Sequence, residues 1–314
     1  MSEGPEIHRL SAQLTEELVG SRIAAIDTRL KKARTWLEMH PGMLEGREIE
    51  RIYPAGKNLL WQLEGGIYFR FHLLMFGKVR TYTLRYRLPP DPKQRAHIVT
   101  TSRQFVLING QVFDIGVGDP FEQITTLREL GPDICAVPFN RDFFLQRLNR
   151  PDNLDREIAP VLLDQTVAAG LGNYLKSDIL FECGINPWAL VGELTPEQQA
   201  SLAEVTPVLS QRARHNRGQT VTDEVMQVLL SDPNNPNPRW SDRHWVFRQT
   251  NKPCKMCGFP IKQRRQGPDA GRITYFCPNC QGVDVDKLPP PPSTEKQSLR
   301  AGRGRSPGIQ NSLA

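Results

Sequence analysis

The chain has 314 residues, 39% of them hydrophobic, which is enough for two domains with their own cores plus a small module. It carries 40 Lys and Arg against 34 Asp and Glu, with a formal net charge of +6 and a pI near 9.1, a balance that favours polyanionic partners. No apolar run approaches the roughly 18 residues of a membrane span, and the acidic start argues against a signal peptide. We therefore expect an intracellular protein, cytoplasmic or associated with the nucleoid, that does not enter a membrane.

The first part of the chain changes from a helical to a β pattern. Ile7, Leu10, Leu14 and Leu18 recur at helical spacing after Pro5, and Gly20 is expected to end that helix. From residue 23 to about 116, short β-rich runs are separated by Gly, Pro and Asn-Gly; these expected strands are 58–63, 67–71, 78–83, 96–100 and 104–108. The pattern predicts an antiparallel sandwich or barrel.

A mostly helical region follows the turn Gly131-Pro-Asp. Helices are expected over 141–148, 160–168, 173–183 and 196–214. Gly170 and Gly172 predict a tight turn before the third of these, whose first backbone N–H groups would suit a phosphate. An ordinary helical hairpin explains the same residues equally well.

Two cysteine pairs, Cys254-x-x-Cys257 and Cys277-x-x-Cys280, lie nineteen residues apart near the C-terminus. Zn²⁺ prefers four tetrahedral thiolates, and two such pairs complete its shell, so the pattern predicts one structural zinc ion on a hairpin with strands at 260–263 and 273–276. The alternatives are two disulfides, which need a secreted context, and a redox centre, which needs only one pair. Cys135 and Cys183 have apolar neighbours and are expected in the core.

These patterns together predict an α+β multidomain protein. The expected parts are an antiparallel β-sandwich with an N-terminal helix over 1–130, a helical domain over 131–244, a four-cysteine zinc finger over 245–282 and a disordered tail over 283–314. Basic residues gather at 29–34, 78–87, 212–217, 239–248 and 262–265. A single cluster is usually a solvated surface, but basic loops beside a basic zinc hairpin suggest phosphate contacts.

Five segments in fixed order carry a family resemblance: Ser-Glu-Gly-Pro-Glu-Ile at 2–7, Ala-Gly-Lys-Asn-Leu-Leu at 55–60, His-Leu-Leu-Met-Phe-Gly at 72–77, Leu-Gly-Asn-Tyr-Leu at 171–175, and 271–281 with its Cys-Pro-Asn-Cys-Gln end. In these segments the chain resembles the formamidopyrimidine-DNA glycosylase and endonuclease VIII family, and its two ends look more like endonuclease VIII. The resemblance implies a helix–two-turns–helix fold for the helical domain, a zinc finger, and damaged DNA bound between the domains. We expect a monomer.

The implied activity is base-excision repair of oxidised bases, with a bias to pyrimidines, coupled to cleavage at the abasic site. The nucleophile is the N-terminal amine exposed when Met1 is removed, and a reference pKa of about 7.7 to 8.0 leaves part of it unprotonated at neutral pH. It attacks C1′ of a flipped nucleotide and expels the base. The Schiff base that remains permits β-elimination and then δ-elimination.

Ser2 departs from the family, which usually has proline there. Serine allows removal of Met1 and forms an imine, but that imine must be protonated to withdraw electrons as well as proline's cationic one. One alternative is therefore a catalytically weak or silent binder of damaged or abasic DNA. A separate alternative is a zinc-ribbon protein of transcription or RNA binding, which would bind undamaged nucleic acid as well as abasic DNA.

The resemblance assigns further roles by position. Glu3 is the general acid, although Glu3 and Glu6 also suit the positive end of the first helix. Lys57 is a proton donor and phosphate contact, although a lysine beside a glycine at a sheet edge is most often solvated. Arg272 grips the 5′ phosphate during δ-elimination, and Asn173 holds a backbone phosphate.

The remaining DNA contacts concern the gap left by the flipped base. His72 opens the segment that holds the wedge candidates Leu74, Met75 and Phe76, for which plain core packing is the alternative. The endonuclease VIII pattern has glutamine at the position of Leu74 and arginine at that of Glu129. Arg128 is the candidate to replace that arginine.

Overall fold

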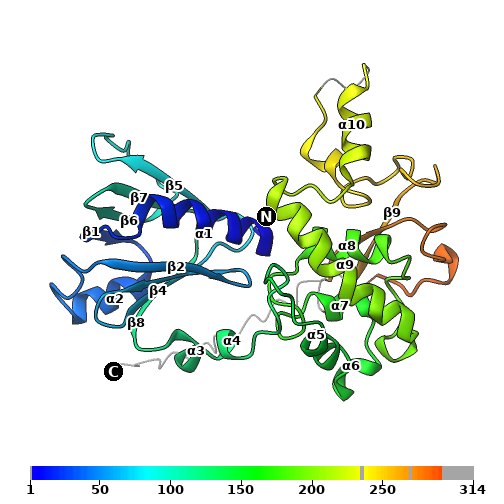
Figure 1. Cartoon of the computed structure of the whole chain (residues 1–314), viewed down its shortest axis with the longest axis horizontal. Helices are drawn as coiled ribbons and strands as arrows, with labels where there is room; N and C mark the ends of the chain where they lie inside the picture. Colours follow the sequence, from blue (N-terminus) through cyan, green and yellow to red (C-terminus); the bar gives the residue numbers. More distant parts are fainter. Residues whose placement is uncertain (1, 234–236, 269–270, 292–314) are drawn as a thin grey trace, which may run out of the picture.

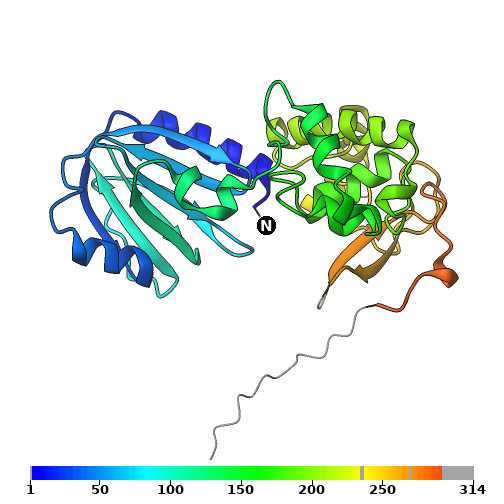
Figure 2. The same cartoon turned by 90° about the horizontal axis from the view of Figure 1, so that it is seen from below.

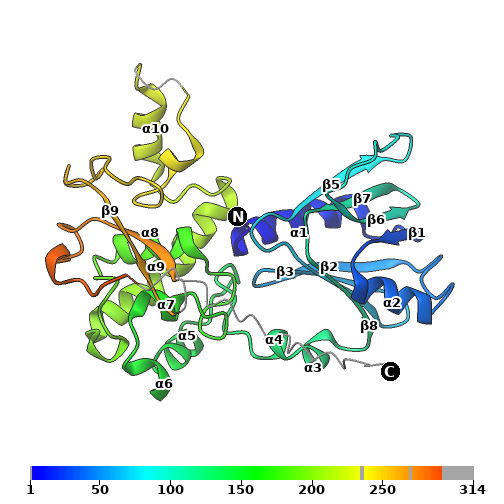
Figure 3. The same ribbon diagram turned by 180° about the vertical axis from the view of Figure 1, so that it is seen from behind.

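The computed structural model describes residues 2–233, 237–268 and 271–291. It has a β-rich lobe and a helical lobe, with the start of the first helix between them (Figure 1). The views from below and from behind show the same arrangement (Figures 2 and 3). The predicted α+β multidomain architecture is confirmed.

The N-terminal helix α1 (Gly4–Leu18) packs on the β-rich lobe. Pro5 lies in its first turn, and Glu3 and Glu6 form a capping box that satisfies backbone N–H groups at its start. Ile7, Leu14 and Leu18 are buried in the core of that lobe, as their spacing predicted.

The β-rich lobe is a sandwich of two four-stranded antiparallel sheets. One has the order β1-β6-β7-β5 and the other β2-β3-β4-β8. The strands are β1 (Ile23–Thr28), β2 (Ile49–Ala55), β3 (Asn58–Leu63), β4 (Ile67–His72), β5 (Lys78–Thr83), β6 (Gln94–Thr100), β7 (Arg103–Ile108) and β8 (Val112–Val117). Five aromatic rings fill the space between the sheets: Trp61, Phe69, Phe71, Phe105 and Phe113.

The helical lobe follows two short helices, α3 (Pro120–Gln123) and α4 (Thr125–Arg128). Its helices are α5 (Arg141–Leu148), α6 (Pro151–Leu154), α7 (Ile158–Leu162), α8 (Asn173–Glu182), α9 (Pro196–His215) and α10 (Asp223–Ser231), with 3₁₀ turns η1 (Val191–Glu193) and η2 (Trp240–Arg243). The antiparallel hairpin of β9 (Lys262–Gln266) and β10 (Arg272–Phe276) packs against α8. None of the described helices is long and apolar enough to cross a membrane.

Several expected boundaries were wrong. The helix predicted over 160–168 ends at Leu162, because the Asp164 side chain accepts the Thr166 N–H in a local turn instead of leaving the chain helical. The strand predicted at 260–263 runs from Lys262 to Gln266. Of the tail predicted to be disordered, 283–291 is described and contains a 3₁₀ turn, η3 (Val285–Lys287); residues 292–314 lie outside the described residues.

Candidate active site between the lobes

The two lobes meet where the start of α1 touches the start of α8. Glu3 is fully buried, and its carboxylate accepts the backbone N–H groups of Tyr174 at 3.0 Å and Leu175 at 3.4 Å. A carboxylate at this place interacts favourably with the helix dipole. These N–H groups therefore bind a side chain of the protein, which corrects the interpretation that they face a phosphate.

The glycine turn before α8 makes this approach possible. Gly4 donates its N–H to the Gly170 carbonyl at 2.8 Å, and a Cβ on Gly4 would lie 3.1 Å from the Gly170 Cα. At Gly172 a Cβ would lie 2.2 Å from the Glu3 Cδ. The predicted tight turn is confirmed, and its glycines let the two lobes touch through backbone.

A pocket of about 190 Å³ surrounds this contact. In the described part of the chain it is lined by Ser2, Glu3, Lys57, His72, Leu74, Met75, Leu163, Gly172, Asn173 and Arg272. Most residues singled out in the sequence thus come together from both lobes and the hairpin. Phe76 and Arg128 do not line it: Phe76 is at the exposed tip of the loop between β4 and β5, and Arg128 is exposed at the end of α4.

Lys57 enters the pocket because its turn is pressed against the helical lobe. Gly56, with φ of +56°, donates its N–H to the Asp133 carboxylate at 2.9 Å, and a Cβ there would lie 3.1 Å from the Gly170 nitrogen. Burial lowers the pKa of the Lys57 ammonium, while Glu3 opposes the shift and Arg272 adds to it. Lys57 is therefore not the freely solvated lysine that its place at a sheet edge suggests.

Opposing effects set the protonation of Glu3. Burial raises its pKa to about 7, although Lys57 and the N–H groups of Tyr174 and Leu175 favour the carboxylate. Burial, with the nearby charges of Arg70 and Lys57, lowers the pKa of His72 to about 4. A carboxyl group that titrates near neutral pH can both give and take a proton at working pH.

The three wedge candidates are not in the core. Leu74, Met75 and Phe76 are 42%, 49% and 68% exposed, whereas the neighbouring Leu73 is buried. The N–H of Leu74 donates to Nδ1 of His72 at 3.2 Å. The Arg272 guanidinium contacts the Met75 sulfur at 3.7 Å, so this loop reaches the hairpin of the other lobe.

The hairpin is fixed to α8 by side chains. Asn173 donates to the Ile273 carbonyl at 2.9 Å and accepts from Lys176 at 3.0 Å. Both ends of the Asn173 amide thus bind protein groups, although the residue was expected to hold a phosphate. Arg272 begins β10 directly beside this contact.

The four cysteines of the finger form one cluster. Their sulfurs all lie within 4.8 Å of one another, with Cys254 3.9 Å from Cys280 and Cys257 3.5 Å from Cys277. A tetrahedral zinc ion with bonds of about 2.3 Å holds its sulfurs about 3.8 Å apart. The six cysteines, all of them described, are free, so the disulfide alternative is wrong, and the convergence of both pairs fits a zinc finger.

Two polar residues, the half-buried Glu6 and the buried Lys176, were given no part in the chemistry. Glu6 was expected only to offset the helix dipole; its carboxylate accepts the Glu3 N–H at 3.0 Å and the Tyr174 hydroxyl at 3.2 Å. Lys176 is 1% exposed, although nothing distinguished it in the sequence. The available signal was a lysine within a helix whose other side chains are mostly apolar.

Comparison with known proteins agrees with this geometry. The model of the formamidopyrimidine-DNA glycosylase N-terminal domain matches residues 1–111, and that of its H2TH domain matches 130–224. Formamidopyrimidine-DNA glycosylase of Thermus thermophilus is 30% identical over 286 residues, covering 90% of this chain and 99% of the relative. The chain belongs to the formamidopyrimidine-DNA glycosylase family. Its sequence resemblance to DNA-repair glycosylases is thus confirmed.

Further relatives match along their whole length. Endonuclease 8 of Escherichia coli is 27% identical, covering 90% of this chain and 100% of the relative. The crystal structure of the Thermus thermophilus Fpg protein is 29% identical with a TM-score of 0.71, covering 90% of this chain and 99% of its own. Lactococcus lactis Fpg in complex with abasic-site DNA has the same fold, with a TM-score of 0.74 at 24% identity, covering 90% of this chain and 100% of its own.

Replacing Gly172 with alanine should disable Glu3 without straining the backbone. The φ of Gly172 is −129°, which any residue adopts, but the added methyl group would overlap the Glu3 carboxyl group. A displacement of about 1 Å costs about 10²-fold in rate. We expect single-turnover excision to fall by that order while DNA binding persists.

Gly192→Ala is the control, since its Cβ would meet only Leu154, at 3.2 Å. Wild-type excision rates in Gly172→Ala would contradict the steric role of this glycine.

Proposed function

We propose that the protein is a bifunctional base-excision enzyme that removes oxidised bases, preferentially pyrimidines, and cleaves the abasic strand. The observation that supports it most is the single pocket that holds Ser2, the buried acid Glu3 and Lys57. Met1 lies outside the described residues, and the proposal requires its removal. In this assignment 1–130 carries the nucleophile and the wedge, while 131–244 and 245–282 bind damaged DNA.

Base removal needs one acid and one nucleophile. Protonated Glu3 gives its proton to the sugar ring oxygen or the departing base, and the free amine of Ser2 supplies the electron pair that forms the bond to C1′. The bond from C1′ to the base breaks, and its electrons leave with the base. The near-neutral pKa of Glu3 suits this role, since an acid ionised throughout the neutral range would have no proton to give.

Strand cleavage uses the Schiff base that forms when the bond from C1′ to the sugar ring oxygen breaks, the oxygen takes a proton, and the electron pair of the Ser2 nitrogen forms a double bond to C1′. A proton is lost from C2′, its electrons form a double bond, and the 3′ phosphate departs in β-elimination. We assign the proton transfer of this step to Lys57, whose pKa is lowered by burial, and the holding of the 5′ phosphate for δ-elimination to Arg272; both residues line the pocket. The imine of Ser2 must be protonated first, so lyase chemistry slower than that of a proline amine is expected.

The DNA contacts follow from exposure and charge. Leu74, Met75 and Phe76 are exposed apolar side chains beside the pocket and would fill the gap left by a flipped nucleotide. Arg128, exposed at the end of α4, is assigned to the opposite strand, and His72 and Asn173 to the strand that enters the pocket. A catalytically silent binder of damaged DNA is the second candidate, because Ser2 stands where the family has proline.

We infer that the four cysteines hold one zinc ion with a structural role. The N–H groups of Met256 and Cys280 point at the sulfurs of Cys254 and Cys277 at 3.4 and 3.5 Å, which favours thiolates. When bound, zinc supplies a cross-link between the segment before β9 and the segment after β10. The position of Arg272, and the contacts of the neighbouring Ile273 and Thr274 to α8, depend on that cross-link.

Borohydride trapping tests the proposed function directly. With an abasic duplex, the wild-type protein should form a covalent adduct that is lost when the N-terminal amine is acetylated. Glu3→Gln should lower excision of an oxidised base by about 10²- to 10⁴-fold, because the general acid is gone, yet still trap a preformed abasic site. DNA binding without any adduct would establish the silent binder instead.

Arg272→Ala should change the products more than the rate of base removal. Without the guanidinium, we expect β-elimination ends to accumulate and δ-elimination ends to disappear on a denaturing gel. Lys262→Ala is the matched control, since Lys262 lies on the neighbouring strand of the hairpin and does not line the pocket. An unchanged ratio of the two ends in Arg272→Ala would remove this residue from the elimination step.

Removing the metal should disable DNA binding through the hairpin. We expect one zinc per chain by elemental analysis, and its removal by a chelator should weaken binding by about tenfold or more, the effect of losing a charge-assisted phosphate contact. Cys257→Ser should lose zinc and melt at a lower temperature. Cys183→Ser, outside the cluster, should keep both properties; a metal-free wild-type protein with full affinity would contradict the assignment.

A further inference from the structure

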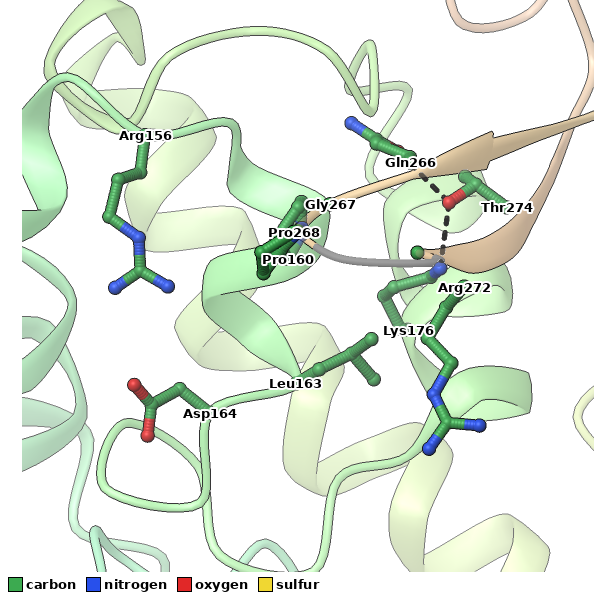
Figure 4. Close-up of a pocket in the computed structure, with 11 residues that line it drawn as sticks. Arg156, Pro160, Leu163, Asp164, Lys176, Gln266, Gly267, Pro268, Arg272 and Thr274 are labelled. Carbon is green, nitrogen blue, oxygen red and sulfur yellow. Dashed lines mark hydrogen bonds between the residues drawn. The ribbon is translucent and has the colours of Figure 1, made fainter. Parts of the chain in front are cut away.

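A second cavity, of about 580 Å³, lies beside the candidate active site and shares Leu163 and Arg272 with it. Figure 4 shows Lys176 and Arg272 at one side of this cavity and Arg156 and Asp164 at the other, with Pro160 and Leu163 between them. The described lining of the cavity thus has three basic side chains and one carboxylate, that of Asp164. The proposed chemistry leaves this cavity and two of its cations, Arg156 and Lys176, without a role.

Lys176 is the unusual member. It is 1% exposed, and its ammonium donates to the Asn173 amide oxygen at 3.0 Å and the Thr274 hydroxyl at 2.8 Å. An ammonium carries three N–H donors, and these two neutral oxygens are its hydrogen-bond partners in the described part of the chain. One donor therefore remains for a group that enters the cavity.

The surroundings of Lys176 favour an anion there. Burial lowers the pKa of this lysine to about 7, Glu3 opposes the shift, and Arg272 adds to it. The Asp164 carboxylate accepts the Thr166 N–H at 2.9 Å at the far side of the cavity. A buried ammonium without a carboxylate partner is unfavourable, so an anion bound beside it is stabilised more than at an exposed lysine.

We propose that this cavity is a phosphate subsite, in which Lys176 and Arg272 bind a phosphate group of a nucleotide that neighbours the lesion. This rests on the proposed action on DNA. The volume of the cavity is in the range that holds a small ligand. Pro160 and Leu163 form an apolar wall that the sugar or base of the nucleotide could contact. A lysine point charge and an arginine fork together suit the oxygens of phosphate.

The subsite would also connect DNA to the hairpin. Thr274, which accepts from Lys176, donates to the Gln266 side chain at 2.9 Å, and Gln266 donates to Glu157 at 2.8 Å. A phosphate at Lys176 is therefore held by α8 and both strands of the hairpin. The same phosphate chemistry has two sources: the diester of an intact strand and the terminal monoester left by strand cleavage.

Neutral phosphate replacements test the proposal. The probe is a duplex with a tetrahydrofuran abasic analogue, in which each phosphate flanking the analogue is replaced in turn by a methylphosphonate. The wild-type protein should bind the duplex about tenfold or more weakly when the replaced phosphate is the one bound by Lys176. Lys176→Met should bind the unmodified duplex more weakly by a similar factor. Its affinity should not fall further when that same phosphate is replaced by a methylphosphonate.

Two variants guard against misfolding and general charge effects. Arg156→Gln removes an exposed cation of the cavity and should give a smaller loss at the same position. Lys31→Met removes one exposed charge on α2 (Lys31–Met39), at the end of the β-rich lobe far from α8, and should keep the wild-type pattern (Figure 1).

A gapped duplex with terminal phosphates, compared with one ending in hydroxyls, distinguishes the two sources. A Lys176→Met effect seen only with terminal phosphates assigns the subsite to the cleaved strand, and an effect on the intact analogue assigns it to the diester. Identical affinities and patterns for Lys176→Met and Lys31→Met in both duplexes would overturn the subsite. The binding assay needs no catalysis, so an inactive wild-type enzyme would refute the lyase proposal and not this one.

Discussion

The site depends on one buried carboxylate bound to the start of a helix in the other lobe. Glu3 is the residue before α1, and the N–H groups that it accepts, those of Tyr174 and Leu175, lie in the first turn of α8. This contact therefore joins the two lobes and fixes the position of the acid. Burial works against the charged form, whereas the N–H groups and Lys57 work for it. Burial is the larger effect and raises the pKa of Glu3 to about 7, whereas a polar, solvated setting would have left an ordinary carboxylate.

The charges around that acid are arranged for a polyanion. Lys57 and Lys176 both have pKa values lowered by burial, and Arg272 lowers each further. Glu3 is the one carboxylate in the described lining of the active-site pocket, and its charge acts on both lysines. Such a cluster of like charges is electrostatically unfavourable alone and becomes favourable when phosphates approach. These cations are therefore a local part of the positive charge that gives the chain its formal net charge of +6.

Local patterns predicted local structure well. The strands at 58–63 and 78–83 and the helix at 141–148 have the expected bounds, and the cysteine spacing predicted the cluster. The helix α2 was missed because Ala33 is its one buried residue, which gives no apolar stripe. Glu3 and Tyr174 are 171 positions apart, so no periodicity could reveal that they meet. The burial of Lys176 has the same cause, since Thr274 lies on the distant hairpin.

The loop between β4 and β5, which carries Leu74, Met75 and Phe76, has a strained backbone. Leu74 has φ of +52°, which costs a non-glycine residue about 1–2 kcal/mol, and three exposed apolar side chains add to that cost. The His72 ring offsets part of it by accepting the Leu74 N–H, and it remains an acceptor at neutral pH because its pKa is lowered to about 4. The loop is therefore shaped before any ligand arrives, and stacking its side chains between bases would bury the surface that now faces water.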